Sequence, residues 1–430
     1  MNILLKSLIP AALLLSATTV ALDVFEEPPI NYSETKANNP ISQLQEALDG
    51  KTATLAHDPE FGYLKSVLDL LQIPEESQVL VFSKTSFQNR LIAPSTPRAI
   101  YFNDNVYIGT VQHGKVLEIS TADPDLGAVF YALSQEPNAR PEFVRQRHDC
   151  LQCHATNLTH NVPGHIVRSV FAAPDGQPIL KAGSLVTDQS TPMDIRWGGW
   201  YVTGTHGKAR HRGNELAHET KNDAVIDSDA GANQLHLPNR VDTTKYLTPH
   251  SDIVAMLVLE HQTRLHNLLT EANFETRMAM HRQSVSDRIF ERDPTVLSES
   301  TQRVIKQAGD KLVDYMIFSN EVEFSDTVHG TSGFAEAFEA KGPRDSKGRS
   351  LRELDLEERL FVYPLSFLIY SPQFDGLPAP VKDHVYQRLW NIFTGAEPTP
   401  DLLHLTNAKN HAIRDILIET KPGLPDYWVK

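Results

Sequence analysis

The most specific chemical spacing in this sequence joins two cysteines and a histidine in the segment Cys150-Leu151-Gln152-Cys153-His154. Two thiols three positions apart can form thioether bonds to the two vinyl groups on neighbouring edges of a haem. The adjacent histidine is then carried beneath the iron as the proximal ligand. This C-x-x-C-H pattern therefore predicts one covalent haem c, attached through Cys150 and Cys153 and ligated by His154.

The same thiols leave two other chemistries open. A C-x-x-C redox pair is expected in a thioredoxin-like βαβ setting, and no such setting is predicted around these residues. A zinc site would need two further ligands, which His148 or His160 could supply. The chain has only 2 cysteines, so it can hold no more than one covalently attached haem and cannot be a disulfide scaffold.

The motif makes the chain resemble the c-type cytochromes, and that resemblance assigns attachment to Cys150 and Cys153 and proximal ligation to His154. Over most of its length the sequence is also similar to large, uncharacterised bacterial proteins described only as containing a cytochrome c domain. This similarity implies haem binding and electron transfer but names no reaction. It is carried by residues 79–84, 101–108, 196–207 and 365–374.

The residue opposite His154 decides between two kinds of function, since a strong sixth ligand favours an electron carrier and an open position permits small-molecule chemistry. Met193 is the first candidate because it lies in a Pro-flanked loop, from which a thioether can reach an iron. His206 and His211 are alternatives in a loop rich in glycine and arginine. His261 is a further alternative, and a vacant position also remains open.

His261 is nominated by helical spacing. It lies on one apolar stripe with Val254, Val258, Leu265, Leu268 and Ala272, which predicts that it is buried. Its neighbours Glu260 and Arg264 are candidate acid–base groups if this helix packs on the haem. Arg210 and Arg212 are candidates for binding haem propionates. His160 and His165 rank lower because they follow the motif too closely to reach the opposite face of the haem.

The segments that position these residues predict an α+β fold. Turn residues between apolar runs predict a small antiparallel sheet with strands over 78–82, 98–102, 106–112 and 116–120, preceded by a helix over 63–71. A loop-rich haem segment follows, with a hairpin formed by 167–172 and 179–185, a strand over 197–203 and a surface loop over 207–248.

The second half of the chain is predicted to be mainly helical. Helices are expected over 252–283, 294–319, 380–393 and 400–420, with a Gly-rich linker over 325–350. The chain therefore divides into a signal peptide, an extended leader, an α+β region, the haem-attachment and loop region, and a helical region. Their expected bounds are 1–21, 22–58, 59–136, 137–248 and 249–430.

The N-terminus predicts export to the periplasm. Lys6 precedes a short apolar stretch from Leu8 to Val20, and cleavage is expected near Ala21. The longest later apolar run, 360–370, contains Pro364, so no transmembrane segment is expected. The compartment agrees with the motif, because the resemblance to c-type cytochromes implies haem attachment outside the cytoplasm.

Composition limits the partners. The 430 residues include 40 Lys plus Arg against 54 Asp plus Glu, a net charge of −14, so a nucleic-acid partner is excluded. An acidic surface favours a redox protein with a basic docking patch. The sequence makes no prediction of the oligomeric state.

Three hypotheses follow. The first is an exported single-haem c-type cytochrome that transfers electrons. The second is a haem-dependent oxidoreductase, peroxidase-like or oxidase-like, with an open distal position. Length favours this second hypothesis, whereas the absence of a second haem motif opposes it. The third is a haem-based sensor or assembly subunit, in which the additional regions form a protein interface.

Overall fold

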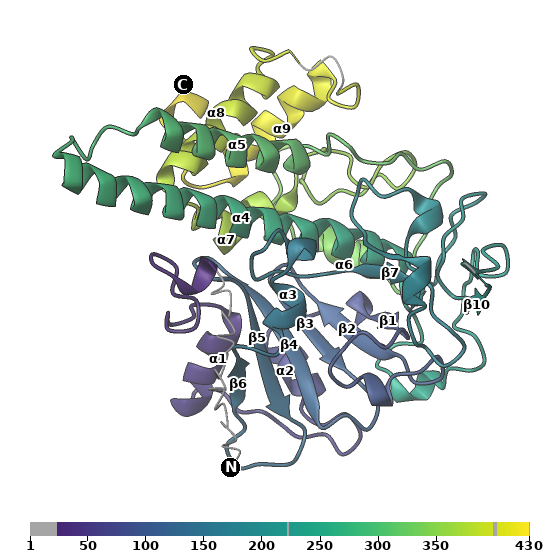
Figure 1. Cartoon of the computed structure of the whole chain (residues 1–430). Helices are drawn as coiled ribbons and strands as arrows, with labels where there is room; N and C mark the ends of the chain where they lie inside the picture. Colours follow the sequence, from purple (N-terminus) through teal and green to yellow (C-terminus); the bar gives the residue numbers. More distant parts are fainter. Residues whose placement is uncertain (1–23, 222, 399–401, 430) are drawn as a thin grey trace, which may run out of the picture.

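The computed structural model describes residues 24–221, 223–398 and 402–429, so the expected signal peptide lies outside the described residues. The α+β prediction is confirmed: a sheet is covered by helices and the C-terminal half is mainly helical (Figure 1). The strands are β1 (Val79–Val81), β2 (Arg98–Phe102), β3 (Val106–Thr110), β4 (Val116–Asp123), β5 (Gly127–Ser134), β6 (Phe143–Gln146), β7 (Arg168–Val170), β8 (Ser184–Val186), β9 (Trp200–Tyr201), β10 (His218–Glu219) and β11 (Ala224–Val225). The helices are α1 (Pro40–Asp49), α2 (Leu64–Leu70), α3 (Leu151–His154), α4 (Ile253–Phe290), α5 (Glu299–Met316), α6 (Phe334–Ala340), α7 (Pro372–Asp375), α8 (Ala379–Phe393) and α9 (Asn407–Thr420).

The main sheet within the described residues has seven antiparallel strands in the order β6-β5-β4-β3-β2-β1-β9. Its centre is built from short local connections. Between β2 and β3, for example, the side-chain oxygen of Asn103 accepts hydrogen bonds from the amides of Asn105 and Val106, which closes the predicted turn. By contrast, β9 reaches β1 from more than a hundred residues away and forms the far edge of the sheet.

The two faces of the sheet are covered differently. Leu80, Tyr101 and Ile108 belong to the apolar core shared with α1 and α2, whereas Phe102 and Tyr107 belong to the core shared with α4. This division follows from the strand geometry, in which successive side chains point to opposite faces. The short helix α3 also lies on the α4 side of the sheet (Figure 1).

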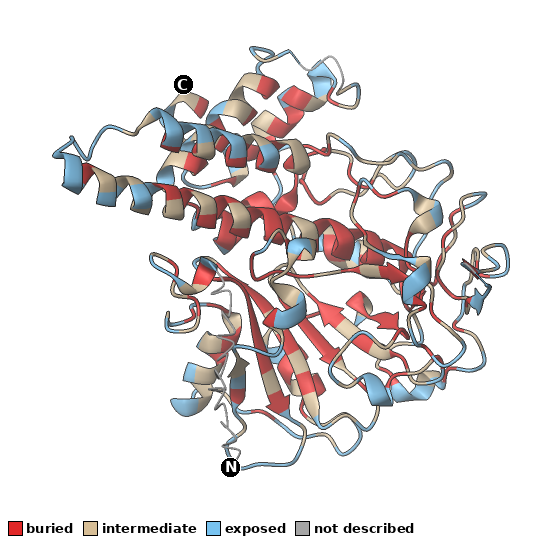
Figure 2. Ribbon diagram, viewed as in Figure 1, coloured by how far each residue is buried: buried red, intermediate tan, exposed pale blue. Residues whose placement is uncertain are grey.

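Helix α4 is the longest element and connects the sheet to the helical half. Its N-cap is Asp252, whose carboxylate accepts hydrogen bonds from the amides of Val254 and Ala255. The predicted apolar stripe is buried, including His261, which has no exposed surface. Figure 2 shows α4 buried where it crosses the sheet and more exposed toward its C-terminal end. It ends at Phe290, seven residues beyond the predicted end.

Several segments differ from the sequence expectation. The expected leader, 22–58, contains α1, which begins after the Asn39 N-cap with Pro40 at its first position and buries Ile41 against the sheet core. Strand β5 was not predicted because it is buried on both faces and therefore shows no alternation. The expected linker 325–350 contains α6, which packs through Phe334 and Phe338.

The four predicted C-terminal helices correspond to α4, α5, α8 and α9, whereas α6 and α7 lie where no helix was predicted. α8 matches the predicted segment closely, whereas α5 begins after the Ser298 N-cap and α9 after the Thr406 N-cap, several residues later than expected. No described helix combines the length and apolar character needed to cross a membrane.

Candidate haem site

The predicted attachment residues share a single helical turn. The amides of Cys153 and His154 donate to the carbonyl of Cys150 at 3.2 and 2.9 Å, which winds the segment into α3. Residues three and four positions apart lie on the same face of a helix, so both thiols and the imidazole project together. Cys153 is exposed and Cys150 is half-buried, and no disulfide joins them. The structure therefore brings together all three residues predicted from the motif.

The imidazole of His154 is oriented by one hydrogen bond. Its Nδ1 lies 2.9 Å from the carbonyl oxygen of Gly164, and because a carbonyl only accepts, Nδ1 carries the proton and donates. Burial lowers the pKa of His154, so the ring is neutral near pH 7. A neutral ring protonated at Nδ1 presents the Nε2 lone pair to a metal, which is the usual arrangement of a ligating histidine and its outer partner.

The surroundings of His154 include apolar and charged groups of the sheet. The Phe130 ring of β5 lies 4.9 Å from the imidazole, centroid to centroid. Nearby, Arg98 of β2 and Glu118 of β4 form an ion pair at 2.8 Å. The Arg98 guanidinium lies flat over Gly109, where an added Cβ would be 2.2 Å from a terminal nitrogen.

Arg98 is a candidate partner for a haem propionate that sequence reasoning missed. Its Nε is buried and has no hydrogen-bond partner among the described residues, so the guanidinium keeps an unused donor. Arginine binds carboxylates through such paired donors. No local signal marks Arg98, because it precedes the motif by about fifty residues and reaches the site only through strand pairing.

The Cys150 thiol is unsuited to dithiol redox chemistry. Burial, reinforced by the negative charges of Glu118 and Asp149, raises the pKa of Cys150 to about 12. Reactive C-x-x-C pairs instead have lowered thiol pKa values. The zinc alternative also lacks a ligand set, since no group of three or more His, Cys, Asp or Glu side chains is arranged for a metal in the described part of the chain. His160, proposed as one such ligand, is engaged by Glu271 and Lys311.

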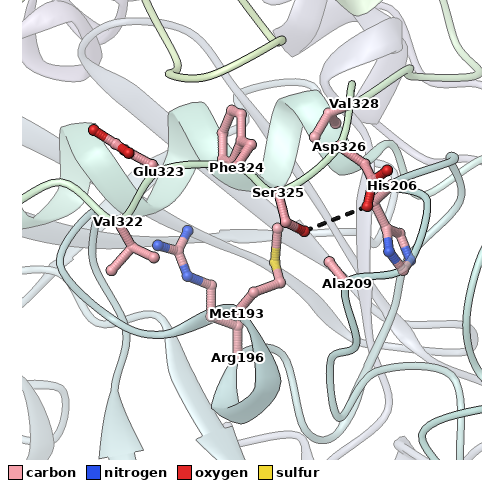
Figure 3. Close-up of a pocket in the computed structure, with 10 residues that line it drawn as sticks. All are labelled: Met193, Arg196, His206, Ala209, Val322, Glu323, Phe324, Ser325, Asp326 and Val328. Atoms are coloured by element: carbon pink, nitrogen blue, oxygen red, sulfur yellow. Dashed lines mark hydrogen bonds between the residues drawn. The ribbon is translucent and has the colours of Figure 1, made fainter.

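Two of the sixth-ligand candidates lie at a different place. Met193 and His206 line a small cavity of about 40 Å³, together with Arg196 and the segment 322–328 (Figure 3). His211 lies beside them, with its ring centroid 4.8 Å from that of His206 and 5.2 Å from that of Trp197. Three of the predicted sixth-ligand candidates, Met193, His206 and His211, therefore lie close to one another.

This second group is remote from His154. Trp197 leads directly into β9, while Phe130, which contacts His154, lies on β5, and four strands of the described sheet separate β5 from β9. At about 4.8 Å between neighbouring strands the separation is roughly 24 Å. Two nitrogen ligands on opposite faces of one metal ion lie only about 4 Å apart, twice a typical metal–nitrogen distance.

Backbone hydrogen bonds also oppose metal binding by His206 and His211. The amide of Asn233 donates to Nε2 of His206 at 3.1 Å, and the amide of Gly213 donates to Nδ1 of His211 at 3.0 Å. Each imidazole therefore carries its proton on the other nitrogen. An N–H group at that position cannot donate a lone pair to iron.

His261 is a hydrogen-bonded core histidine. Its two ring nitrogens lie 2.7 Å from Gln189 Oε1 and 2.7 Å from Ser366 Oγ, and Phe318 stacks on it at 4.6 Å. Burial lowers the pKa of His261 to about 3, so it is neutral. Both nitrogens are engaged, which leaves no lone pair for a metal in this arrangement.

The acid–base candidates beside His261 are also engaged. Glu260 pairs with Arg196 at 3.0 Å inside the core, and burial raises the pKa of Glu260 to about 7 despite the arginine charge. Arg264 lies 3.5 Å from Asp188. Of the closely following histidines, His165 is buried near His154, with its Nδ1 3.3 Å from Ser120 Oγ.

Comparison with known proteins adds no relative. No model of a known protein family matches the chain, and no curated protein or solved structure shows significant similarity to it.

Proposed function

We propose that this chain is an exported monohaem c-type cytochrome that binds one covalent haem c and transfers electrons. The observation that carries the proposal is the state of His154. Its neutral ring donates from Nδ1 to the Gly164 carbonyl, which leaves the lone pair on Nε2, on the same helical turn as the two thiols that would form thioethers.

The groups around α3 fit the proposed cofactor. A bound haem would supply reversible one-electron chemistry. Cys150 and Cys153 would fix its edge, His154 would hold the iron from one side, and the unused Nε donor of Arg98 would bind a propionate. Phe130 supplies an apolar contact beside the ligand, and the net charge of −14 favours a redox partner with a basic docking patch.

A haem-dependent oxidoreductase with an open distal position is the second candidate. It is favoured by the placement of the four nominated sixth ligands. Met193, His206 and His211 lie near the far edge of the sheet, and His261 is hydrogen-bonded at both nitrogens. Three of the four are therefore remote from His154 and the fourth has no free nitrogen, and an iron without a strong sixth ligand is open to small molecules.

The test is to produce the full chain in a bacterial periplasm that carries c-type haem maturation. Haem that remains on the chain in a denaturing gel supports the proposal, and a chain recovered without covalent haem overturns it. Spectra of the ferrous protein with and without carbon monoxide separate the two candidates. A low-spin ferrous form that is indifferent to carbon monoxide supports the carrier, whereas carbon monoxide binding supports the open site.

The Met193→Leu and His206→Gln variants are expected to keep the haem spectrum and reduction potential of the parent protein, because neither side chain lies opposite His154. Absorption spectra and redox titrations of the two variants measure this. Loss of a sulfur-to-iron charge-transfer band in the Met193→Leu variant alone would contradict the expectation and would place Met193 on the iron.

A further inference from the structure

Residues 163–165 connect the proposed haem ligand to both layers of the fold. The Gly164 carbonyl accepts from His154 Nδ1, and the Gly164 amide donates at 2.8 Å to the His154 carbonyl. The preceding carbonyl, of Pro163, accepts from the amide of Ala128 in β5 at 3.0 Å. The segment is therefore tied to the ligand in its middle and to the sheet at its start.

Asn267 of α4 holds the other end of this segment. Its Oδ1 accepts from the His165 amide at 2.7 Å, and its Nδ2 donates to the His165 carbonyl at 2.8 Å. The side chain is 1 % exposed, so water does not compete for these bonds. An asparagine that both accepts from and donates to one residue fixes the position and the orientation of that residue's peptide groups.

Gly164 also packs directly against the Asn267 side chain. A Cβ added at this glycine would lie 2.4 Å from Asn267 Oδ1 and 2.9 Å from Thr159 Cβ. Glycine is therefore required for the backbone to approach the asparagine so closely. The carbonyl that orients His154 belongs to the residue enclosed between Asn267 and Thr159.

We propose that Asn267 is a positioning residue for the iron ligand: it holds the Gly164 carbonyl against His154 Nδ1 and so sets the orientation and basicity of the imidazole. This inference rests on the proposed haem function. It gives α4 a specific part in the site, although α4 contributes no ligand of its own.

The consequence is electronic as well as geometric. A hydrogen bond from Nδ1 makes a ligating imidazole a stronger donor, which favours the ferric form of iron. Loosening the Gly164 carbonyl weakens that bond and therefore favours the ferrous form. At a fixed solution potential, the ferrous-to-ferric ratio of the Asn267→Ala holoprotein is expected to exceed that of the parent severalfold, because the weaker imidazole donor stabilises the ferric form less.

Asn273→Ala is the matched control. Asn273 lies on the same helix, is 2 % exposed, and donates to the main-chain carbonyls of Pro124 at 3.1 Å and Gly376 at 3.4 Å. Its loss also removes buried hydrogen bonds from α4 to neighbouring backbone, but not from the segment that holds His154. It is expected to lower stability and to leave the redox ratio unchanged.

A second readout needs no haem. In the full-length apoprotein, ¹⁵N NMR of the imidazoles reports the tautomer of His154. The His154 signal is identified as the one that is missing from the spectrum of a His154→Gln variant. The parent and Asn273→Ala proteins are expected to show the Nδ1-protonated form. Asn267→Ala is expected to show a mixture of both tautomers. If the parent carries no covalent haem, the proposed function fails while this measurement still tests the positioning role.

The proposal is overturned if Asn267→Ala and Asn273→Ala have the same ferrous-to-ferric ratio and the same His154 tautomer. Asn267 would then have only a structural role. If Asn267→Ala does not fold, Gly164→Ala probes the same contact from the other side, and Asn267→Asp retains the acceptor for the His165 amide. Gly164→Ala and Asn267→Asp are expected to shift the redox ratio and the tautomer in the direction given for Asn267→Ala. If they do not, the proposal is equally contradicted.

Discussion

Replacing both Cys150 and Cys153 with serine is expected to abolish covalent haem attachment. Serine has no sulfur to form a thioether, and the chain has only these 2 cysteines to supply one. Each single replacement leaves one thioether and should retain a reduced amount of attached haem. Haem staining of denaturing gels, with intact-mass measurement of the chain, reports all three variants.

The loss must be distinguished from misfolding. Cys153 is exposed and Cys150 half-buried, so the double variant is expected to keep its folded structure by circular dichroism, with stability within about 1 kcal/mol of the haem-free parent. A His160→Gln variant is the local control. His160 follows the motif closely but pairs with Glu271 and Lys311, so attached haem should be unchanged. Haem that stays on the double variant after denaturation would refute the attachment.

The parts of the site that the sequence predicted depend on local geometry. Cys150, Cys153 and His154 meet because three- and four-residue spacing places them on one turn. The turn at Asn103 and the buried stripe of α4 were predictable for the same reason, since an Asx turn and a helical period each involve residues close in sequence.

The parts that the sequence did not predict depend on strand pairing and packing across the chain. Arg98 and Glu118 reach the candidate haem site because β2 and β4 flank β3 in the sheet. Asn267 reaches it from a helix a hundred residues downstream. Neither contact has a local pattern, because a strand register or a helix packing position is fixed by the whole core.

The sixth-ligand candidates show a related limit. Residue type and glycine-rich context nominated Met193, His206 and His211, and they do gather in space, but near β9 rather than opposite His154. For His261 the helical stripe correctly predicted burial. The buried imidazole is, however, hydrogen-bonded at both nitrogens, to Gln189 and Ser366, rather than available to a metal. A buried histidine is identified as a ligand only when one of its nitrogens is free, and that depends on tertiary partners.

The largest expected effect on stability comes from Arg196→Met. The Arg196–Glu260 pair is nearly inaccessible, with side-chain exposures of 3 % and 0 %. Removing one partner of such a pair leaves the other charge buried, which costs about 3–5 kcal/mol. The variant also loses the bonds that Arg196 donates to the carbonyls of Thr191 and Gln189, at 2.7 and 3.1 Å. Urea denaturation at pH 8 measures the total effect.

The pH dependence identifies the mechanism. Burial raises the pKa of Glu260 from its ordinary 4.5 to about 7 in the folded state, so the folded chain binds this proton more tightly than the unfolded chain. Its contribution to stability is therefore fully present below pH 4.5 and is lost as the pH rises through 7. Without Arg196 the pKa rises further, so the destabilisation of Arg196→Met should be larger at pH 8 than at pH 5.

Two controls complete the prediction. Lys306→Met removes one partner of an exposed pair, in which Lys306 is 66 % exposed and lies 2.5 Å from Asp310, and should cost no more than about 1 kcal/mol at either pH. The double variant Arg196→Met/Glu260→Gln removes the buried charge itself, so its stability should no longer depend on pH through this pair. If the penalty of Arg196→Met were the same at pH 5 and pH 8, the lost carbonyl bonds and packing would account for it, and Glu260 would not be the group that titrates.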